Sequence, residues 1–124
     1  MPDYLDVEAA LRAWFTAGGI TARISTRKPA GDKAVAWLQL VRTGGAQATL
    51  VTETPLVALS AYADTAVAAL ALLNHARRLL HRSAITPAAP FIHAVEVGGP
   101  VNLPDPDLPE QTRYTANWRL WTRT

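Results

Sequence analysis

Apolar residues recur every three or four positions near the start of the chain, which indicates a helix with one buried face. In the segment 3–17 this pattern is formed by Tyr4, Val7, Leu11, Trp14 and Phe15. Acidic residues lie near its beginning, where a helix dipole favours carboxylates, and Gly18-Gly19 predicts its end.

A second helix is expected from Ala66 to Arg82, because this run is rich in alanine and leucine and contains no glycine or proline. Asp64 and Thr65 just before it offer oxygen atoms that can cap its first turn. Its predicted buried stripe consists of Ala69, Leu72, Leu73, Ala76, Leu79 and Leu80.

Between the two helices, apolar residues alternate with polar ones, which is typical of strands with one wet face. The alternation covers residues 20–27 and resumes over 34–43, and the turn-forming segment 28–33 between them predicts an antiparallel hairpin. Gly44-Gly45 is expected to end the second of these strands. A third extended segment follows over 49–62. Its proline, Pro55, predicts a bend or bulge, and Pro55 is expected either to start the inner strand or to lie at an edge.

Two more strands are predicted after the second helix. The first covers 91–97 and is expected to end at Gly98-Gly99-Pro100. The segment 101–110 is rich in proline and acidic residues, and we expect an irregular loop there. The last strand covers 111–123, with one core face and one basic face that carries a tryptophan.

The predicted order of helix, three strands, helix and two strands defines an α+β fold with a single, mostly antiparallel sheet and two helices packed on one face. The 124 residues are expected to form one domain, residues 1–124. Hydrophobic residues make up 49% of the chain and charged residues 18%, which indicates a globular rather than a disordered protein. Cysteine is absent, which excludes disulfides, thiolate zinc sites and a cysteine nucleophile.

The formal charge of +2 is too small to indicate nucleic-acid binding by itself. No segment has the run of about 18 apolar residues that a membrane span needs. The first residues are acidic, unlike the basic start of a signal peptide, so we expect no membrane association and synthesis in the cytoplasm.

Residues with catalytic or metal-binding chemistry are sparse. His75 and His81 fall on different faces of the predicted helix, so they do not form a metal pair. Asp105, Asp107 and Glu110 are spaced like part of a calcium loop, but the glycine at its turn is missing. No nucleophile elbow or phosphate-binding glycine series is present. The sequence therefore predicts a protein that is not an enzyme and uses no metal or cofactor.

The basic face of the last strand combines Arg113, Arg119 and Arg123 with Trp121. Arginine beside an exposed tryptophan is common in protein interfaces, where both residue types contribute strongly to binding. The same face could instead be solvated, or it could contact phosphates and stack on a base, as in single-strand binders. The residues alone leave these three interpretations open.

Nearly the whole chain resembles the tail terminator, or tail completion, proteins of long-tailed phages with non-contractile tails, particularly phages of actinobacterial hosts. The resemblance is carried by DVEAALRAWF (6–15), by the segment 22–45, by the segment 54–80 and by the segment 93–123. Its most specific part is GGPVNLPDPD (98–107), which precedes a last strand with an Arg-Tyr pair near its start.

The resemblance implies a structural virion protein that forms a ring, usually a hexamer, at the head-proximal end of the tail tube. Such a ring stops polymerisation of the tube and presents a surface to the head completion or connector protein. The implied partners are therefore further copies of the chain, the tail tube protein and the head completion protein, in the tail-neck region of a virion assembled in the host cytoplasm. DNA passes through the lumen without specific binding, and the family has no catalytic residues to transfer.

A head-to-tail ring requires two different complementary patches on each subunit. We expect these at the basic tip 28–33 and at the acidic loop 101–110, which could pair between neighbours. The candidate interface residues are Arg27, Lys28, Asp32, Lys33, Asn102, Asp105, Asp107, Arg119 and Trp121. Because every phosphate contact adds affinity for DNA, the Arg113, Arg119 and Arg123 face is expected to be covered or to point away from the lumen.

Two other classes fit the same sequence features. A head-tail adaptor is also a small ring-forming protein without an active site, and it differs from a terminator in where it acts. A nucleic-acid-binding module would use the arginines and the tryptophan of the last strand.

Overall fold

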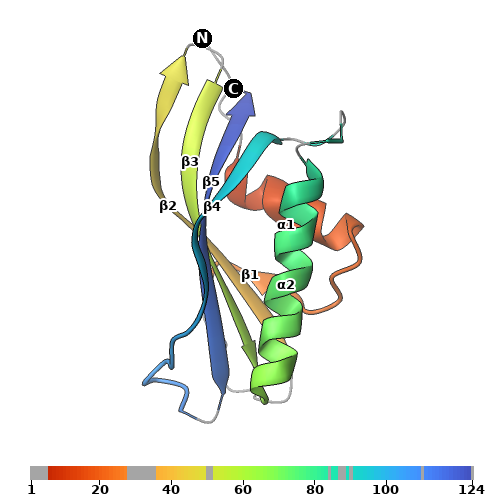
Figure 1. Cartoon of the computed structure of the whole chain (residues 1–124), viewed down its shortest axis with the longest axis vertical. Coiled ribbons are helices and arrows are strands. Elements are labelled where there is room, and N and C mark those ends of the chain that lie inside the picture. The colour runs from red at the N-terminus through yellow and green to blue at the C-terminus, as the bar shows by residue number, and fades with distance from the viewer. Residues whose placement is uncertain are drawn as a thin grey trace.

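The structure is a computed structural model, and it describes residues 6–27, 36–49, 52–83, 85–86, 89, 91–109 and 111–123. Within these residues the chain forms one five-stranded sheet and two helices (Figure 1). The elements are α1 (Val7–Ala17), β1 (Arg23–Ser25), β2 (Trp37–Thr49), β3 (Thr52–Ala63), α2 (Ala66–Ser83), β4 (Phe91–Asn102) and β5 (Thr112–Arg123).

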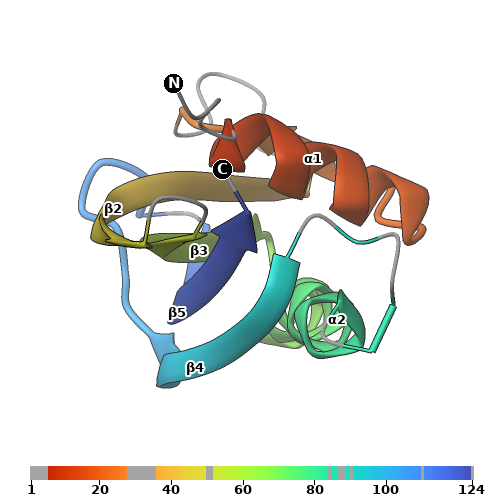
Figure 2. The ribbon, with the colours of Figure 1, turned by 90° about the horizontal axis from the view of Figure 1, so that it is seen from above.

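The strand order in the sheet is β1-β2-β3-β5-β4. Strand β2 pairs antiparallel with β3, β3 with β5, and β5 with β4, whereas β1 runs parallel to β2. Both helices lie on the same side of the sheet, with α1 over β2 and α2 over β3, β5 and β4 (Figures 1 and 2). The predicted α+β class, element order and mostly antiparallel sheet are confirmed.

The core lies between the helices and the sheet face that they cover. Trp118 and Leu120 of β5 are completely buried there, together with Leu59 of β3 and with Leu38 and Leu40 of β2. From the helices, Leu11 and Phe15 of α1 and most of the predicted stripe of α2 join the same cluster, while Leu72 is only partly buried. Each large side chain buried in this way contributes about 1.5–3 kcal/mol to the stability of the fold.

The two helices begin at capping residues. Asp6 has an extended backbone and its carboxylate accepts a hydrogen bond from the Ala9 amide at 3.1 Å, so α1 starts at Val7, later than predicted. Thr65 caps α2 in the same way, because its hydroxyl oxygen accepts the Ala68 amide at 3.1 Å. The predicted position of the second helix is therefore confirmed.

The predicted hairpin between residues 20–27 and 34–43 is wrong. Strand β1 is only three residues long and pairs parallel to β2, with Arg23 opposite Trp37. The Trp37 indole donates a hydrogen bond to the Arg27 carbonyl at 2.9 Å, which fixes the chain just after β1 against β2. Alternation correctly identified the buried side of this segment, with Ile20 and Ile24 in the core, but alternation carries no information on strand direction.

The two glycine pairs do not end strands, so the two strand ends expected at them are wrong. Strand β2 continues through Gly44-Gly45 to Thr49, and β4 continues through Gly98-Gly99-Pro100 to Asn102. Both pairs lie at register shifts in their ladders, so the glycines absorb bulges instead of stopping the strands.

Pro55 lies inside β3, a strand with partners on both sides, and not at an edge. It pairs with Gly45 of β2, and the ladder between β3 and β5 skips Thr54 and Pro55. A proline has no amide hydrogen to donate, which accounts for a local gap in a central strand. The expected irregularity is present near Pro55. Both expected positions of Pro55, the start of the inner strand and an edge, are wrong.

Candidate assembly surfaces

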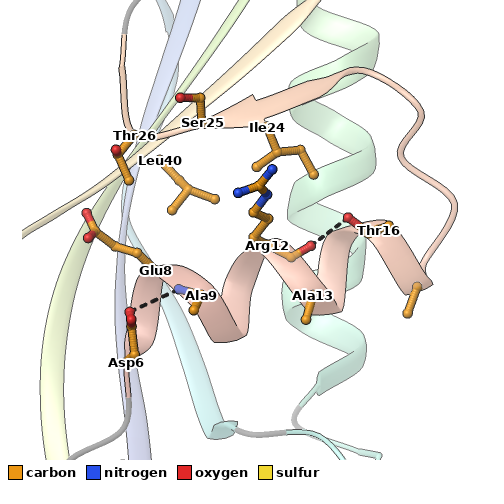
Figure 3. A pocket seen from close by; sticks show the side chains of 11 residues that line it. Asp6, Glu8, Ala9, Arg12, Ala13, Thr16, Ile24, Ser25, Thr26 and Leu40 are labelled. Atoms are coloured by element: carbon orange, nitrogen blue, oxygen red, sulfur yellow. Dashed lines mark hydrogen bonds between the residues drawn. The ribbon is translucent and has the colours of Figure 1, made fainter.

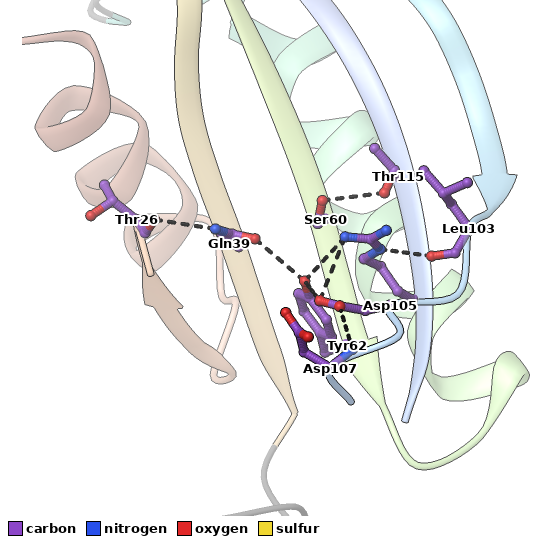
Figure 4. A network of polar contacts seen from close by, with 9 residues as sticks. Thr26, Gln39, Ser60, Tyr62, Leu103, Asp105, Asp107 and Thr115 are labelled. Carbon is purple, nitrogen blue, oxygen red and sulfur yellow. Dashed lines mark hydrogen bonds and ion pairs between the residues drawn. The ribbon is translucent and has the colours of Figure 1, made fainter. Parts of the chain in front are cut away.

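The loop that follows β4 is attached to the sheet face that the helices leave open (Figure 1). Tyr62 of β3 points to this face and is completely buried, and its hydroxyl donates a hydrogen bond to the Asp105 carboxylate at 3.1 Å. The Gln39 amide oxygen lies 3.5 Å from the same hydroxyl (Figure 4). Tyr62 therefore gives the loop a polar anchor on β3.

Arg113 of β5 completes this polar cluster. Its Nε donates to the Leu103 carbonyl at 2.7 Å, and its guanidinium lies 3.7 Å from the Asp105 carboxylate. Asp105 also accepts the Asp107 amide at 3.0 Å, which forms an Asx turn in the loop. The buried charge of Asp105 is thus compensated by a cation and by hydrogen-bond donors, as a buried carboxylate requires.

Burial raises the pKa of Tyr62 above its ordinary value. The hydrogen bond to Asp105 acts in the same direction, while Arg113 acts against it by favouring the phenolate. The phenol therefore stays protonated at neutral pH and remains a hydrogen-bond donor to Asp105.

The structure separates the predicted interface residues. Asp105 is buried in its own chain and faces Tyr62, so it is not an outward contact in this conformation, contrary to expectation. Asn102 and Asp107 are exposed at the same end of the molecule. Arg27 is exposed just after β1, whereas the expected basic tip, with Lys28, Asp32 and Lys33, lies outside the described residues.

The side chains on the basic face of β5 differ in whether they bind other parts of the subunit or are open to solvent. Arg113 is engaged with the loop, while Arg119 is exposed and Trp121 is half-buried with its ring 5.0 Å from that of His93. The side chain of Arg123 is outside the described part of the structure. Only part of this face is therefore an open cationic surface.

Strand β4 carries an exposed apolar strip that the sequence pattern did not indicate, and it consists of Val95, Val97 and Val101. Their exposed fractions are 40%, 61% and 51%, which is unusual for valines in a strand. Val95 pairs with Arg119 and Val101 with Thr115, which places both on the open face, and Val97 lies at the bulge between them. We call this group the valine strip.

A groove of about 750 Å³ runs between the outer side of α1 and β1 (Figure 3). Ile24 and Leu40 contribute apolar side chains from the sheet, and α1 contributes small or polar side chains. Glu8 and Arg12 point from α1 toward β1. The residues that line this α1–β1 groove are Asp6, Glu8, Ala9, Arg12, Ala13, Thr16, Ala17, Ile24, Ser25, Thr26 and Leu40.

The three histidines lie apart in the structure. His75 contacts the Gly18 carbonyl, His81 packs edge-on against Trp118 with ring centroids 5.0 Å apart, and His93 packs against Trp121. Among the described residues, no group of three or more metal-ligating side chains comes together. Each histidine thus has an identifiable packing or hydrogen-bonding contact.

Neither described helix is long and apolar enough to cross a bilayer. No protein-family model matches this chain, and no curated protein is similar enough to it to count as a relative.

Proposed function

We propose that this chain is a structural virion protein that forms a closed ring, a hexamer by its resemblance, at the head-proximal end of a phage tail tube. In this role it stops tube polymerisation and presents a surface for joining the head. The structural observation that supports the proposal is the presence of two chemically different open surfaces at opposite edges of one sheet. The valine strip lies on edge strand β4, and the α1–β1 groove lies at edge strand β1.

This arrangement suits a ring because head-to-tail association needs two unlike patches on each subunit. Both sheet edges are also poor templates for strand addition. Strand β1 has three residues, and β4 is interrupted by bulges and by Pro100. Subunit contacts through side-chain surfaces are therefore favoured over continuation of the sheet from one subunit to the next.

The use of Arg113 inside the subunit supports the passage of DNA without specific binding. Its guanidinium is held by Leu103, Asp105 and Tyr62, so it is not offered to phosphates. Arg119 is the cation of β5 that stays exposed among its described side chains. With one open arginine among its described side chains, β5 offers few phosphate contacts, and this limits the affinity of its open face for a polyanion at physiological salt.

Native mass spectrometry and electron microscopy test this proposal together. The purified protein is expected to form a closed oligomer whose mass is a multiple of 13.4 kDa. Phage lacking the protein is expected to produce overlong tails. Tails of normal length without heads would instead assign the protein to head-tail joining, and a chain that remains monomeric even with added tail tubes would contradict the ring.

A further inference from the structure

We propose that the ring is closed by the valine strip of one copy, which docks in the α1–β1 groove of the next copy. This inference rests on the proposed ring and names the two surfaces that meet. The strip and the groove belong to opposite edge strands, so the strip of a subunit cannot dock in the groove of the same subunit. A second copy of the same chain supplies the complementary surface, and repetition of this contact propagates around a ring.

The apolar parts of the two surfaces match in kind. The valine strip exposes three branched side chains that gain free energy when they leave water. The groove offers the exposed methyl groups of Ala9 and Ala13 from α1, while Ile24 and Leu40 form its almost completely buried apolar floor. Because alanines project little from a helix, a valine side chain can approach the α1 backbone closely at these positions.

The charges beside the apolar parts are also complementary. Arg119 is paired in register with Val95, so the cation lies next to the strip. Asp6 and Glu8 lie at the groove, where they accept hydrogen bonds from the amides of Ala9 and Arg42. Among the described residues no ion pair involves Arg119, Asp6 or Glu8. Docking would bring Arg119 toward these carboxylates and fix the orientation of the two subunits.

The groove also contains one cation, Arg12. The docked strip does not have to supply a negative charge to compensate it. Its guanidinium points toward Ile24 across the groove, between the carboxylate of Glu8 and the far end of the helix (Figure 3). The net charge of the groove side chains is therefore negative, with Asp6 and Glu8 against Arg12. This negative groove therefore pairs better with the cationic surface beside the valine strip than with the groove of another copy.

Two single substitutions test this contact from its two sides. Val97→Glu places a carboxylate in the strip, and Ala13→Glu places one in the groove beside Asp6 and Glu8. Both positions are exposed in the single subunit, so the fold is expected to remain intact, which circular dichroism checks. Val67→Glu is the matched control, because Val67 is an exposed valine of α2 that belongs to neither the groove lining nor β4. Each test variant is expected to raise the protein concentration needed for ring formation at least about tenfold, while the control leaves it unchanged.

The mixture of the two variants gives the sharper result. The Val97→Glu chain keeps an intact groove, and the Ala13→Glu chain keeps an intact strip, so one native contact forms between them. The other two surfaces both carry the new carboxylate and repel each other. Native mass spectrometry is therefore expected to show monomers for each variant alone and a one-to-one dimer for the mixture.

Other outcomes overturn the proposal in distinguishable ways. Rings of wild-type size in both variants would show that a ring exists but closes through other surfaces. A dimer of the Ala13→Glu chain with itself would show that like surfaces meet. A wild-type chain that remains monomeric at every concentration, even with added tail tubes, would contradict both this contact and the ring.

Discussion

The hydroxyl group of Tyr62 helps to hold the loop after β4 in position through its hydrogen bond to Asp105. The residue lies on the open face of the sheet, yet the loop after β4 covers it so that it is fully buried. Its hydroxyl reaches Asp105, and Arg113 supplies the positive charge that such a buried carboxylate needs. The loop is therefore held by a small polar cluster rather than by an apolar core.

This cluster predicts a loss of stability at high pH. Burial raises the pKa of Tyr62 in the folded state, so on alkaline titration the unfolded chain loses this proton first. The contribution of the neutral phenol to stability is complete below about pH 10 and is lost as the pH rises through the folded pKa. Urea unfolding measured between neutral pH and about pH 11 is expected to show this decrease.

The Tyr62→Phe variant separates this effect from general alkaline unfolding. It is expected to lose about 1–2 kcal/mol at neutral pH, because Asp105 loses a hydrogen-bond donor, and to show a weaker decrease above pH 10. Tyr114→Phe is the control, since Tyr114 is only partly buried. An equally steep alkaline decrease in Tyr62→Phe would contradict the assignment to Tyr62.

The polar cluster was the part of the candidate site that sequence reasoning missed. Asp105 stands in a proline-rich acidic segment, and such a segment usually indicates a solvated loop. Its burial depends on Tyr62 and Arg113, which come from two other strands. No local sequence pattern around Asp105 indicates its contacts with Tyr62 and Arg113. The prediction that Asp105 points outward was therefore wrong.

The helices and strands differ in how well each can be predicted from its own local sequence. Both helices and β5 could be predicted, because their periodicity and the caps at Thr65 and Gly18 are local signals. The direction of β1 and the continuation of β2 and β4 could not be predicted, because neighbouring strands decide them. A glycine pair indicates a strand end or a bulge equally well, and only the partner strand distinguishes the two.

At Gly45 the partner strand leaves no room for a side chain. A Cβ atom there would lie 2.3 Å from the Thr54 carbonyl oxygen, and the residue has a φ of +109°. Gly45→Ala is therefore expected to destabilise the fold by about 2 kcal/mol or more, from backbone strain together with the clash. Gly98→Ala is the control, because its nearest contact would be an ordinary 3.5 Å. Similar urea midpoints for the two variants would contradict this account.

At the scale of the molecule, the helix stripes predicted correctly that one face of the sheet is covered. The valine strip was not recognised, because the alternation of Val95 and Val97 with Ala94 and Glu96 does not show which of the two faces is buried. Glu96 faces α2, where it forms a two-pronged ion pair with Arg77 at 2.6 and 3.0 Å, and the valines face outward.

A ring formed by folded subunits makes thermal stability depend on protein concentration. Association binds the folded state and not the unfolded chain, so the melting temperature of the wild-type protein is expected to rise by a few degrees for each tenfold increase in concentration. Scanning calorimetry over about two decades of concentration measures this slope. Val97→Glu is expected to abolish the slope and Val67→Glu to preserve it. A flat wild-type profile would contradict self-association over that range.

The strand order also determines when a newly made subunit completes the surface that carries the valine strip. In the described sheet β4 pairs only with β5, although β4 is synthesised first. While the ribosome is still translating β5, the emerging β4 has no strand beside it, and β3 has a neighbour on one side only. The valine strip therefore acquires its final geometry only after residues 112–123 have left the exit tunnel. In the proposed ring, the native contact through the valine strip therefore forms only after translation of the chain has passed β5.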